Sequence, residues 1–475
     1  MTECCPVRRW AQECPAQPAI LGPEPLDYRH LDRRLNALCA RLDAQGMHRG
    51  MRLAAPVRGN LEDVLLAWAC VRLGLIFCPL NPAFPPLRQQ ALAERLRVDG
   101  VWGIDAMGPW RQLRLDVESE REESGDWPLD PEQPNNLILT SGSSGEPKAV
   151  LHRLANHLAS ARGSSRLLPL DHDCGWLLSL PLFHVGGYAI LFRVFLAGAT
   201  LVLHDRNRPL KTRLECEPIT HLSLVPTQLW RLLAEGFDPA KTRLRELLLG
   251  GAAIPAPLVA RLTALGLTPR VSYGLSEMAS QVCTATPTLP GRVGFPLPDR
   301  EVKIEEGEIC VRGETLFMGY DTPDGIDPAR DDEGWFHTRD RGDLIDSGEL
   351  VVEGRLDNLF ISGGENIQPE TIEQRLVDHP AVAQALVVPV TSEEWGERPV
   401  CFIEWRDAPA PQAELEEWIR GQLPGFMVPD HWLPWPDGGG ELKPRRGEWR
   451  LNALDTLRQT PSCIPPEEAV DNYQS

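Results

Sequence analysis

Residues 140–148 read Thr140-Ser141-Gly142-Ser143-Ser144-Gly145-Glu146-Pro147-Lys148, and no other stretch of the chain says as much about its fold. The glycines let the backbone turn its N–H groups inward, the hydroxyls add donors, and the lysine supplies a positive charge for phosphate oxygens. The apolar run Leu137-Ile138-Leu139 directly before it predicts a buried strand. The stretch is therefore a candidate phosphate-binding loop at a strand end, although its composition is also typical of a flexible surface loop.

Two commoner nucleotide-binding patterns are absent from the sequence. A Walker A motif requires Gly-Lys followed by Ser or Thr, whereas Lys148 follows Pro147 and precedes Ala149. No Gly-x-Gly-x-x-Gly pattern follows a predicted strand elsewhere, which disfavours a dinucleotide site.

Length and charge narrow the class of protein. A chain of 475 residues is too long for one ordinary core, so at least two domains are expected. The sequence has 48 Lys and Arg against 67 Asp and Glu, a net charge of −19. This acidic balance disfavours a general nucleic-acid or anionic-membrane surface, because phosphate-rich partners need a basic footprint. Anionic small molecules bound inside a cleft are not excluded.

Targeting and redox signals favour a cytoplasmic protein. Residues 1–10 show no secretory signal, and the most apolar stretch, residues 65–80, is interrupted by Arg72, Gly74 and Pro79. The 12 cysteines lack metal-type spacing, so we expect reduced thiols.

Periodicity predicts an α/β architecture. Apolar spacing typical of helices occurs at residues 31–42, 61–73 and 259–265, and short β-rich runs occur at 199–203, 221–225, 246–249 and 302–304. A strand at 349–353, a helix at 369–377, a β-rich run at 385–390 and a strand at 400–405 predict a second, α+β unit. We therefore expect domains at 1–356 and 357–455, with a boundary at Asp357 and a poorly ordered tail at 456–475.

Five further segments combine glycines with polar or aromatic residues. They are Leu180–Gly187 with His184, Leu247–Ala252, Tyr273–Glu277, Trp335–Asp343 and Ser362–Ile367. Each also has a structural alternative: a hydrogen-bonded core histidine, a buried strand end, a β-turn, a salt-bridged turn and a structural glycine turn.

In their order, these segments resemble the adenylate-forming superfamily of acyl-CoA synthetases, peptide-synthetase adenylation domains and luciferases. The resemblance spans about residues 10–454 and rests on the Ser/Gly/Lys loop, Tyr-Gly-x-Ser-Glu, Trp-Phe-x-Thr-x-Asp, Gly-Arg-x-Asp and Ser-Gly-Gly-Glu-Asn-Ile. Longer runs resemble its 2-succinylbenzoate–CoA ligase family, which serves menaquinone synthesis. These runs are Leu178–Val185, Ser223–Leu233, Leu248–Pro255 and Gly354–Phe360.

This resemblance implies a large N-terminal α/β domain with a small barrel-like subdomain, and a small mobile α+β C-terminal domain that swings about Asp357. It implies ATP-dependent ligation of 2-succinylbenzoate to coenzyme A through an acyl-adenylate, with Mg²⁺ as cofactor. Glu277 would hold Mg²⁺, because this hard cation prefers carboxylate and phosphate oxygens. The residues expected to bind ATP or AMP are Thr140, Ser141, Gly142, Ser143, Ser144, Gly145, Lys148, Gly250, Gly251, Ala252, Tyr273, Gly274, Ser276, Glu277, Asp340 and Arg355.

The resemblance also implies roles for individual residues. Lys148 would hold the β- and γ-phosphates, Tyr273 would lie against the adenine, and Asp340 would bind the ribose hydroxyls. Lys443, on the small domain, would approach the α-phosphate and the attacking carboxylate. Pro444-Arg445-Arg446 follows Lys443 where polar residues are usual, so a surface lysine in a Gly-rich turn is the alternative. The turn at Gly363, Gly364 and Glu365 would line the pantetheine tunnel.

The acyl pocket has its own candidates. The aliphatic carboxylate of 2-succinylbenzoate reacts, and the aryl carboxylate must be recognised without reacting. Because a buried carboxylate requires a paired cation, Arg193 in an apolar run is the expected partner. The alternative is an arginine that extends its charged end into water. His184 would gate the pocket as a third catalytic candidate beside Lys148 and Lys443, and Ser223, Thr227 and Ser276 are weaker candidates for substrate oxygens.

Three rival functions remain at this point. They are another aryl- or acyl-CoA synthetase, an enzyme that loads a carrier protein, and a nucleotide-binding regulator without catalysis. No room for a carrier domain is expected after Leu454, and the presence of Lys148, Glu277, Asp340 and Lys443 disfavours a regulator. The expected partners are small molecules, with no nucleic acid and no membrane, and a homo-oligomer is left open.

Overall fold

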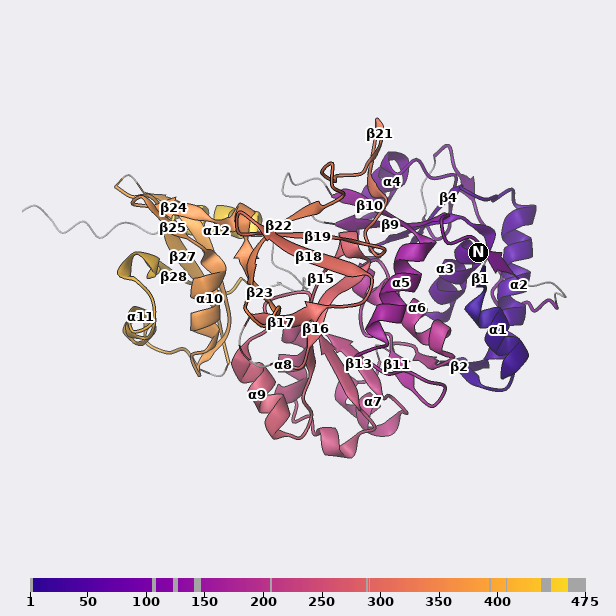
Figure 1. Cartoon of the computed structure of the whole chain (residues 1–475), viewed down its shortest axis with the longest axis horizontal. Coiled ribbons are helices and arrows are strands. Elements are labelled where there is room, and N and C mark those ends of the chain that lie inside the picture. The colour runs from indigo at the N-terminus through magenta and orange to yellow at the C-terminus, as the bar shows by residue number, and fades with distance from the viewer. Residues whose placement is uncertain are drawn as a thin grey trace, which may run out of the picture. The chain divides into compact units, whose positions relative to one another are not determined.

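The computed structural model describes residues 3–104, 108–122, 127–140, 147–205, 207–287, 289, 291–392, 394–406, 408–436 and 446–459. The chain divides into two compact units, Met1–Asp357 and Asn358–Ser475 (Figure 1). The sequence-based expectation begins the second domain with Asp357, whereas Asp357 is the last residue of the first compact unit. The tail expected at 456–475 lies outside the described residues from 460 onward.

One sheet of the first unit joins eight strands over the described ranges. Their order is β21 (Gly325–Asp327), β20 (Gly319–Thr322), β10 (Lys148–Arg153), β9 (Pro134–Thr140), β5 (Ile76–Leu80), β4 (Arg52–Pro56), β6 (Gly100–Val101) and β7 (Arg111–Gln112). Strands β9, β5, β4, β6 and β7 pair in parallel, whereas β10 pairs antiparallel with β9, and β20 pairs antiparallel with β10. Strand β9 contains the run Leu137-Ile138-Leu139 that the sequence predicts as a buried strand.

A second sheet of the same unit changes from parallel to antiparallel partway across. Its order is β18 (Arg300–Glu305), β19 (Glu308–Gly313), β22 (Phe336–Leu344), β23 (Leu350–Arg355), β17 (Arg292–Pro296), β16 (Ser280–Ala285), β15 (Arg270–Leu275), β14 (Glu246–Leu249), β13 (His221–Leu224), β11 (Gly175–Leu177), β12 (Thr200–Val202), β2 (Pro18–Leu21) and β3 (Leu26–Asp27). The strands from β2 to β15 pair in parallel, and every pair from β15 to β18 is antiparallel. The change occurs at β15, the strand that contains Tyr273.

Helices cover these sheets (Figure 1). They are α1 (Pro6–Glu13), α2 (Tyr28–Ala44), α3 (Leu61–Leu73), α4 (Pro86–Arg95), α5 (Leu154–Ser164), α6 (Val185–Ala197), α7 (Leu210–Cys216), α8 (Pro226–Ala234) and α9 (Ala256–Ala264); β1 (Glu3–Cys4) pairs with β8 (Pro128–Leu129). Helix α3 has the bounds that the apolar spacing predicts, because Asn60 and Asp63 form a reciprocal capping box at its start. It ends at Gly74, whose φ of 67° suits a residue without a Cβ.

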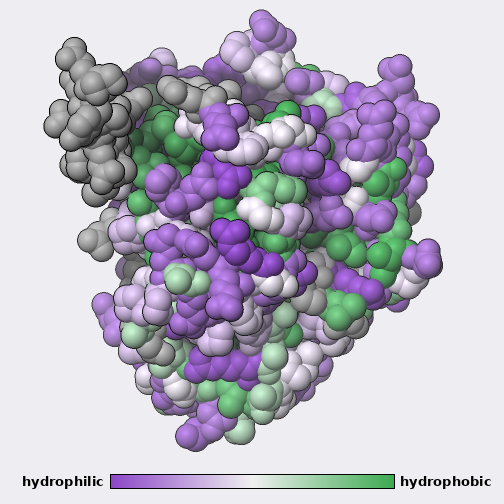
Figure 2. All heavy atoms as spheres, turned by 90° about the vertical axis from the view of Figure 1, so that its left-hand side faces the viewer, coloured by the Kyte–Doolittle hydropathy of each residue, from purple (hydrophilic) through white to green (hydrophobic). Residues whose placement is uncertain are grey.

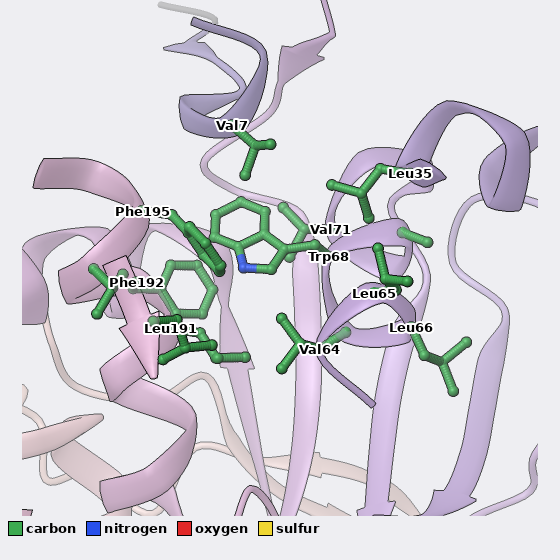
Figure 3. Packing of buried hydrophobic residues seen from close by; sticks show 14 of the residues in the cluster. Val7, Leu35, Val64, Leu65, Leu66, Trp68, Val71, Leu191, Phe192 and Phe195 are labelled. Carbon is green, nitrogen blue, oxygen red and sulfur yellow. The ribbon is translucent and has the colours of Figure 1, made fainter. Parts of the chain in front are cut away.

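Helix α6 packs against α3 in the core, so its one charged residue is buried. Trp68 of α3 packs against Phe192 and Phe195 of α6, with ring centroids 5.3 and 5.4 Å away (Figure 3). Helix α6 is apolar around most of its circumference, as is typical of a helix surrounded by protein. Arg193 lies between these two phenylalanines in sequence and is buried with the helix.

The second unit is the α+β domain that the sequence predicts. Its sheet contains β24 (Phe360–Ser362), β25 (Glu365–Ile367), β26 (Val382–Ser392), β27 (Gly396–Trp405) and β28 (His431–Pro434). Its helices are α10 (Pro369–Val377), α11 (Gln412–Arg420) and α12 (Arg446–Gln459). Helix α10 has the predicted bounds, and its buried Ile372 and Leu376 face the core of this unit.

Surface features agree with the composition. On the side drawn in Figure 2, hydrophilic side chains are interspersed with apolar ones. The large exposed apolar residues come from separate elements, the ordinary pattern for a globular protein: Leu87, Leu265, Leu289, Phe295, Ile326, Ile361, Trp395 and Leu451. In the described part of the chain, no helix is long and apolar enough to cross a membrane. Every cysteine described there is a free thiol, as expected.

Candidate active site

Strands β9 and β10 form the two ends of the Ser/Gly/Lys loop. Thr140 and Lys148 are cross-strand partners, so the first and last residues of the segment lie side by side. Ser141, Gly142, Ser143, Ser144 and Gly145 lie outside the described residues. Lys148 is exposed, and its Nζ lies 4.6 Å from the centre of the Tyr320 ring, a cation–π contact.

Gly250 directly follows one of two neighbouring parallel strands, and Tyr273 belongs to the other. They lie at the carboxyl ends of β14 and β15, and a Cβ on Gly250 would lie 3.4 Å from the carbonyl oxygen of Ser272. Gly251 has a φ of +82°, and both it and Ala252 are exposed. Ligands of open α/β sheets bind at the carboxyl ends of parallel strands. The location therefore suits a flat ring above Gly250, Gly251 and Ala252.

Position 274 requires glycine, because the backbone of β16 lies very close to it. The ladder between β15 and β16 shifts register between Tyr273 and Gly274, and a Cβ on Gly274 would lie 2.1 Å from the Ser280 oxygen. Only glycine fits this bulge. In the segment Tyr273–Glu277, the first three residues end strand β15, and Ser276 and Glu277 lie in a 3₁₀ turn, so the β-turn alternative does not describe its strand part.

Tyr273, Asp340 and Arg355 form one hydrogen-bonded group. The Tyr273 hydroxyl donates to Asp340 Oδ2 at 2.6 Å, and Arg355 Nη1 lies 3.0 Å from Asp340 Oδ1. Burial and the Asp340 carboxylate raise the pKa of Tyr273, so its hydroxyl remains a donor. Each carboxylate oxygen has two lone pairs, so Asp340 can still accept bonds from a diol. The salt-bridged-turn alternative is wrong, because Asp340 lies in strand β22.

Asp357 ends the first unit between two arginines. Arg339 Nη2 lies 3.1 Å from its Oδ1, and Arg355 Nη2 lies 3.1 Å from its Oδ2. Burial alone would lower the pKa of Arg355, but Asp340 and Asp357 outweigh it and raise the pKa. Arg355 therefore connects the expected ribose carboxylate to the expected hinge residue.

Glu277 lies in the 3₁₀ turn Ser276–Met278 that follows β15. Its Oε1 accepts a hydrogen bond of 2.7 Å from the Tyr320 hydroxyl, and Phe317 N donates to its backbone oxygen at 2.8 Å. No other described side chain bonds to the Glu277 carboxylate, which leaves Oε2 available. A half-buried carboxylate with one free oxygen fits a hard divalent cation such as Mg²⁺.

His152 supports the same turn from the interior. Its Nε2 lies 2.7 Å from the Ser276 backbone oxygen, and the ring is fully buried. Burial lowers the pKa of His152 to about 4 and likewise lowers the pKa of His157 beside it. Both imidazoles are therefore neutral in the folded protein at neutral pH.

We expect the stability of the first unit to fall in mild acid. The unfolded chain binds a proton on His152 below its ordinary pKa of about 6.5, whereas the folded chain binds it only near the lowered pKa of about 4. The free energy of unfolding should decrease by about 1.4 kcal/mol per pH unit for each such histidine between these values. Urea unfolding at pH 7.5 and pH 5.5 measures this slope. His152→Gln should reduce the slope, and replacing the exposed His48 by glutamine should leave it unchanged; equal slopes in all three proteins would contradict the expectation.

Arg193 is a buried cation without a carboxylate partner among the described residues. Its Nη2 donates to Gln281 Oε1 at 2.9 Å and to Ser280 Oγ at 3.1 Å, and its Nε has no partner. Burial lowers the pKa of Arg193 to about 9, and the nearby Arg300 guanidinium adds to this effect. The side chain is 5% exposed, so the alternative of a charged end in water is wrong. Such a cation favours an anionic ligand.

Trp176 joins Arg193 to Ser223. The Arg193 guanidinium lies 5.3 Å from the centre of the Trp176 ring, and Trp176 Nε1 donates to Ser223 Oγ at 3.3 Å. Thr227 is half-buried near the start of α8, three residues after β13 ends, and Ser276 is half-buried in the Glu277 turn. These three hydroxyl residues and Arg193 thus belong to elements around one end of β13 and β15.

His184 precedes α6 as its N-cap residue and is exposed. The alternative of a core histidine is therefore wrong, and the ring packs 4.6 Å from that of Phe183. Gly187 in the first turn is fixed, because a Cβ there would lie 2.2 Å from the Pro181 oxygen.

The second unit contributes a glycine turn. Gly363 and Gly364 connect β24 to β25 with φ angles of 59° and 88°, and Glu365 begins β25. Two consecutive positive φ values are typical of a type I′ hairpin and require glycine or asparagine. All three residues are exposed. Lys443 lies outside the described residues.

Another group of potential metal ligands lies on β18, β19 and β22. Ligand atoms of Glu305, Cys310 and His337 lie within 4.8 Å of one another. The ammonium of Lys303 already lies 2.9 Å from Glu305, and a thiol and an imidazole are poor ligands for Mg²⁺. Glu277 fits that ion better.

Sequence reasoning missed three residues of the site: Tyr320, His152 and Trp176. Each acts on an expected residue from a segment distant in sequence, so no local pattern identifies it. The tyrosine does follow Gly319 directly, but a Gly-Tyr pair alone does not indicate what the tyrosine contacts.

Comparisons with known proteins agree with this geometry. The sequence model described as AMP-binding enzyme matches residues 7–321, and the one described as AMP-binding enzyme C-terminal domain matches residues 371–437. A 2-succinylbenzoate–CoA ligase of Salmonella typhimurium is 40% identical over 442 residues, which cover 92% of this chain and 94% of that protein.

Solved structures of two relatives are similar over nearly the whole chain. An arginine-to-lysine variant of Escherichia coli MenE with bound OSB-AMS has a TM-score of 0.86 and 35% identity, covering 95% of this chain and 99% of that one. The o-succinylbenzoate CoA synthetase (MenE) of Bacillus subtilis, in complex with the acyl-adenylate intermediate OSB-AMP, has a TM-score of 0.83 and 28% identity, covering 97% and 99%. The same Bacillus subtilis protein in complex with ATP and magnesium ion has a TM-score of 0.81 and 28% identity, covering 92% and 96%.

Proposed function

The chain belongs to the AMP-binding enzyme family, and on this premise we propose that it ligates 2-succinylbenzoate to coenzyme A. The products are 2-succinylbenzoyl-CoA, AMP and pyrophosphate, and the reaction serves menaquinone synthesis. ATP and coenzyme A are the co-substrates, and Mg²⁺ is the cofactor. The relative in complex with an acyl-adenylate supports the choice of acid, and the relative in complex with ATP and magnesium ion supports the co-substrate and the metal.

The observation that carries the choice of acid is the buried Arg193. A simple fatty or aryl monocarboxylate has no second anion to offer it, whereas 2-succinylbenzoate has an aryl carboxylate besides the carboxylate that reacts. A bound carboxylate would pair with the guanidinium and satisfy the unpartnered Nε. Ser223, Thr227 and Ser276 are the candidates for the keto oxygen and the remaining carboxylate oxygen.

In the first half-reaction, the aliphatic carboxylate attacks the α-phosphorus of ATP, and the bond from that phosphorus to the β-phosphate bridging oxygen breaks. Thr140, Lys148 and the intervening loop hold the β- and γ-phosphates and orient the leaving pyrophosphate. Glu277 holds Mg²⁺, which supplies positive charge to phosphate oxygens when bound. Tyr273 and Gly250 to Ala252 bind the adenine, and Asp340 and Arg355 bind the ribose. Lys443 approaches the α-phosphate, so catalysis here is positioning and electrostatic stabilisation.

In the second half-reaction, the thiol of coenzyme A loses its proton and attacks the acyl carbon, and the bond to the AMP oxygen breaks. We place the pivot between the two half-reactions at Asp357, where the first unit ends. Gly363, Gly364 and Glu365 then line the pantetheine path, and His184 gates the acyl pocket. Free thiols and cytosolic co-substrates favour a cytoplasmic location.

A panel of carboxylic acids tests this function. Pyrophosphate release should depend on 2-succinylbenzoate and continue only when coenzyme A is added. The analogue 4-oxo-4-phenylbutanoate, which lacks the aryl carboxylate, is the matched control and should react much more weakly. Equal turnover of both acids would favour a less selective aryl-CoA synthetase, and turnover only with a phosphopantetheinyl carrier protein would favour a carrier-loading enzyme.

A further inference from the structure

Tyr320 contacts both charged groups that the proposed function assigns to the triphosphate and its metal. Its hydroxyl donates to Glu277 Oε1 at 2.7 Å, and its ring centre lies 4.6 Å from Lys148 Nζ. From these two contacts we infer that Tyr320 is a positioning residue, which holds Glu277 ready for Mg²⁺ and Lys148 ready for phosphate. The inference rests on the function proposed above.

The strand register explains how one side chain reaches both groups. Val150 of β10 and Tyr320 of β20 are cross-strand partners, and Lys148 lies two residues before Val150 on the same face. Lys148 is thus the diagonal neighbour of Tyr320, within reach of a long side chain. Glu277 comes from a different sheet, whose turn is tied to this region by the bond from Phe317 N to the Glu277 oxygen.

The Tyr320 ring is held in place by packing. It makes T-shaped contacts with Phe317 and Phe336 at centroid distances of 4.9 and 6.4 Å, and both of these rings are buried. The next residue, Asp321, pairs with Arg52 at 2.8 Å, which anchors β20 to β4. A tyrosine fixed on both sides can orient its neighbours at little entropic cost.

Each contact suits the charge that it serves. The Tyr320 hydroxyl donates a hydrogen bond to one oxygen of the Glu277 carboxylate and leaves the other oxygen to a metal ion. Bonds of this kind orient a metal ligand and tune its affinity. The negative face of the ring attracts the Lys148 ammonium without neutralising it.

Tyr320 also keeps two opposite charges apart. A direct ion pair between Lys148 and Glu277 would occupy both groups that the substrate needs. Within the described residues, neither side chain forms an ion pair, and each contacts Tyr320 instead. Tyr320 therefore contacts the Lys148 ammonium and the Glu277 carboxylate separately. Each of these two groups keeps its charge for the substrate or the metal.

Titration calorimetry of ATP binding, with and without Mg²⁺, separates the two contacts. Tyr320→Phe removes only the hydroxyl and should weaken Mg²⁺-dependent ATP binding by roughly 10-fold to 100-fold, with metal-free ATP binding unchanged. Tyr320→Leu also removes the ring and should weaken metal-free binding by about 3-fold or more. Tyr28→Phe, which removes a buried hydroxyl bonded to the Ala199 oxygen far along the chain, is the matched control and should bind as the unmodified protein does.

A double-mutant cycle distinguishes positioning from general support. Once Glu277→Gln has weakened the Mg²⁺ dependence, adding Tyr320→Phe should cause no further loss, whereas a merely structural role gives additive losses. Coenzyme A transfer from supplied acyl-adenylate should survive in Tyr320→Phe. Wild-type-like ATP binding by Tyr320→Phe, additive losses or loss of that transfer would each overturn the inference. If Glu277→Gln itself left the Mg²⁺ dependence intact, the metal role in the proposed function would fail instead.

Discussion

Replacing Arg193 by methionine should raise the KM for 2-succinylbenzoate far more than any other change in the acyl pocket. The substitution removes the buried cation and leaves the aryl carboxylate to enter an apolar site unpaired. Loss of one partner of a buried charge pair costs about 2–5 kcal/mol, which is roughly 30-fold or more in KM. Steady-state kinetics with each substrate varied in turn measure this effect, and the KM for ATP should not change.

Two controls make the Arg193 result specific. With 4-oxo-4-phenylbutanoate, which has no aryl carboxylate, Arg193→Met should cause little additional loss. Among the described residues, the polar partners of Arg193 in the free protein are the neutral acceptors Ser280 and Gln281, and its guanidinium also lies against the Trp176 ring, so the substitution should not lower the thermal unfolding midpoint appreciably. An unchanged KM for 2-succinylbenzoate would contradict the pocket assignment.

Replacing Lys443 by alanine should abolish acyl-adenylate formation and largely spare the second half-reaction. In the proposed role, the ammonium would stabilise charge that develops at the α-phosphate, and removal of such a donor lowers the rate by about 10²–10³. The two halves are measured separately, by pyrophosphate release without coenzyme A and by thioester formation from supplied acyl-adenylate.

The control for Lys443 is a lysine of no expected role. Lys241→Ala, at an exposed position that pairs with Asp238, should leave both half-reactions unchanged. Equal losses in the two half-reactions of Lys443→Ala would contradict a role of Lys443 in adenylate formation alone. They would indicate that the lysine stabilises the fold.

Much of the fold could be predicted because local patterns and tertiary structure agree. Helices α3 and α10 and strand β14 have the predicted bounds, since their apolar spacing and their flanking residues indicate the same ends. The segment around Asp340 was harder to interpret. Its alternating acids and arginines are typical of a solvated turn, yet they lie on a nine-residue strand whose neighbours pair with them.

The residues of the candidate site likewise fall into those that the sequence could predict and those that it could not. Tyr273, Glu277, Asp340 and Arg193 belong to short recognisable segments, so the sequence could predict them as candidates. Tyr320 and Trp176 act only through contacts between segments that are far apart in the chain, such as the 2.7 Å bond from Tyr320 to Glu277. No periodicity or spacing encodes such contacts, because they depend on sheet register and on which strands become neighbours.

Trapping the intermediate tests the central claim most directly. The protein is mixed with 2-succinylbenzoate, ATP and Mg²⁺ without coenzyme A, quenched, and analysed by mass spectrometry. A ligase of the proposed kind gives a burst of pyrophosphate matched by 2-succinylbenzoyl-adenylate, and later addition of coenzyme A converts this adenylate to thioester and AMP in equal amounts. Formation of ADP and phosphate, or a burst with other acids but none with 2-succinylbenzoate, would contradict the account.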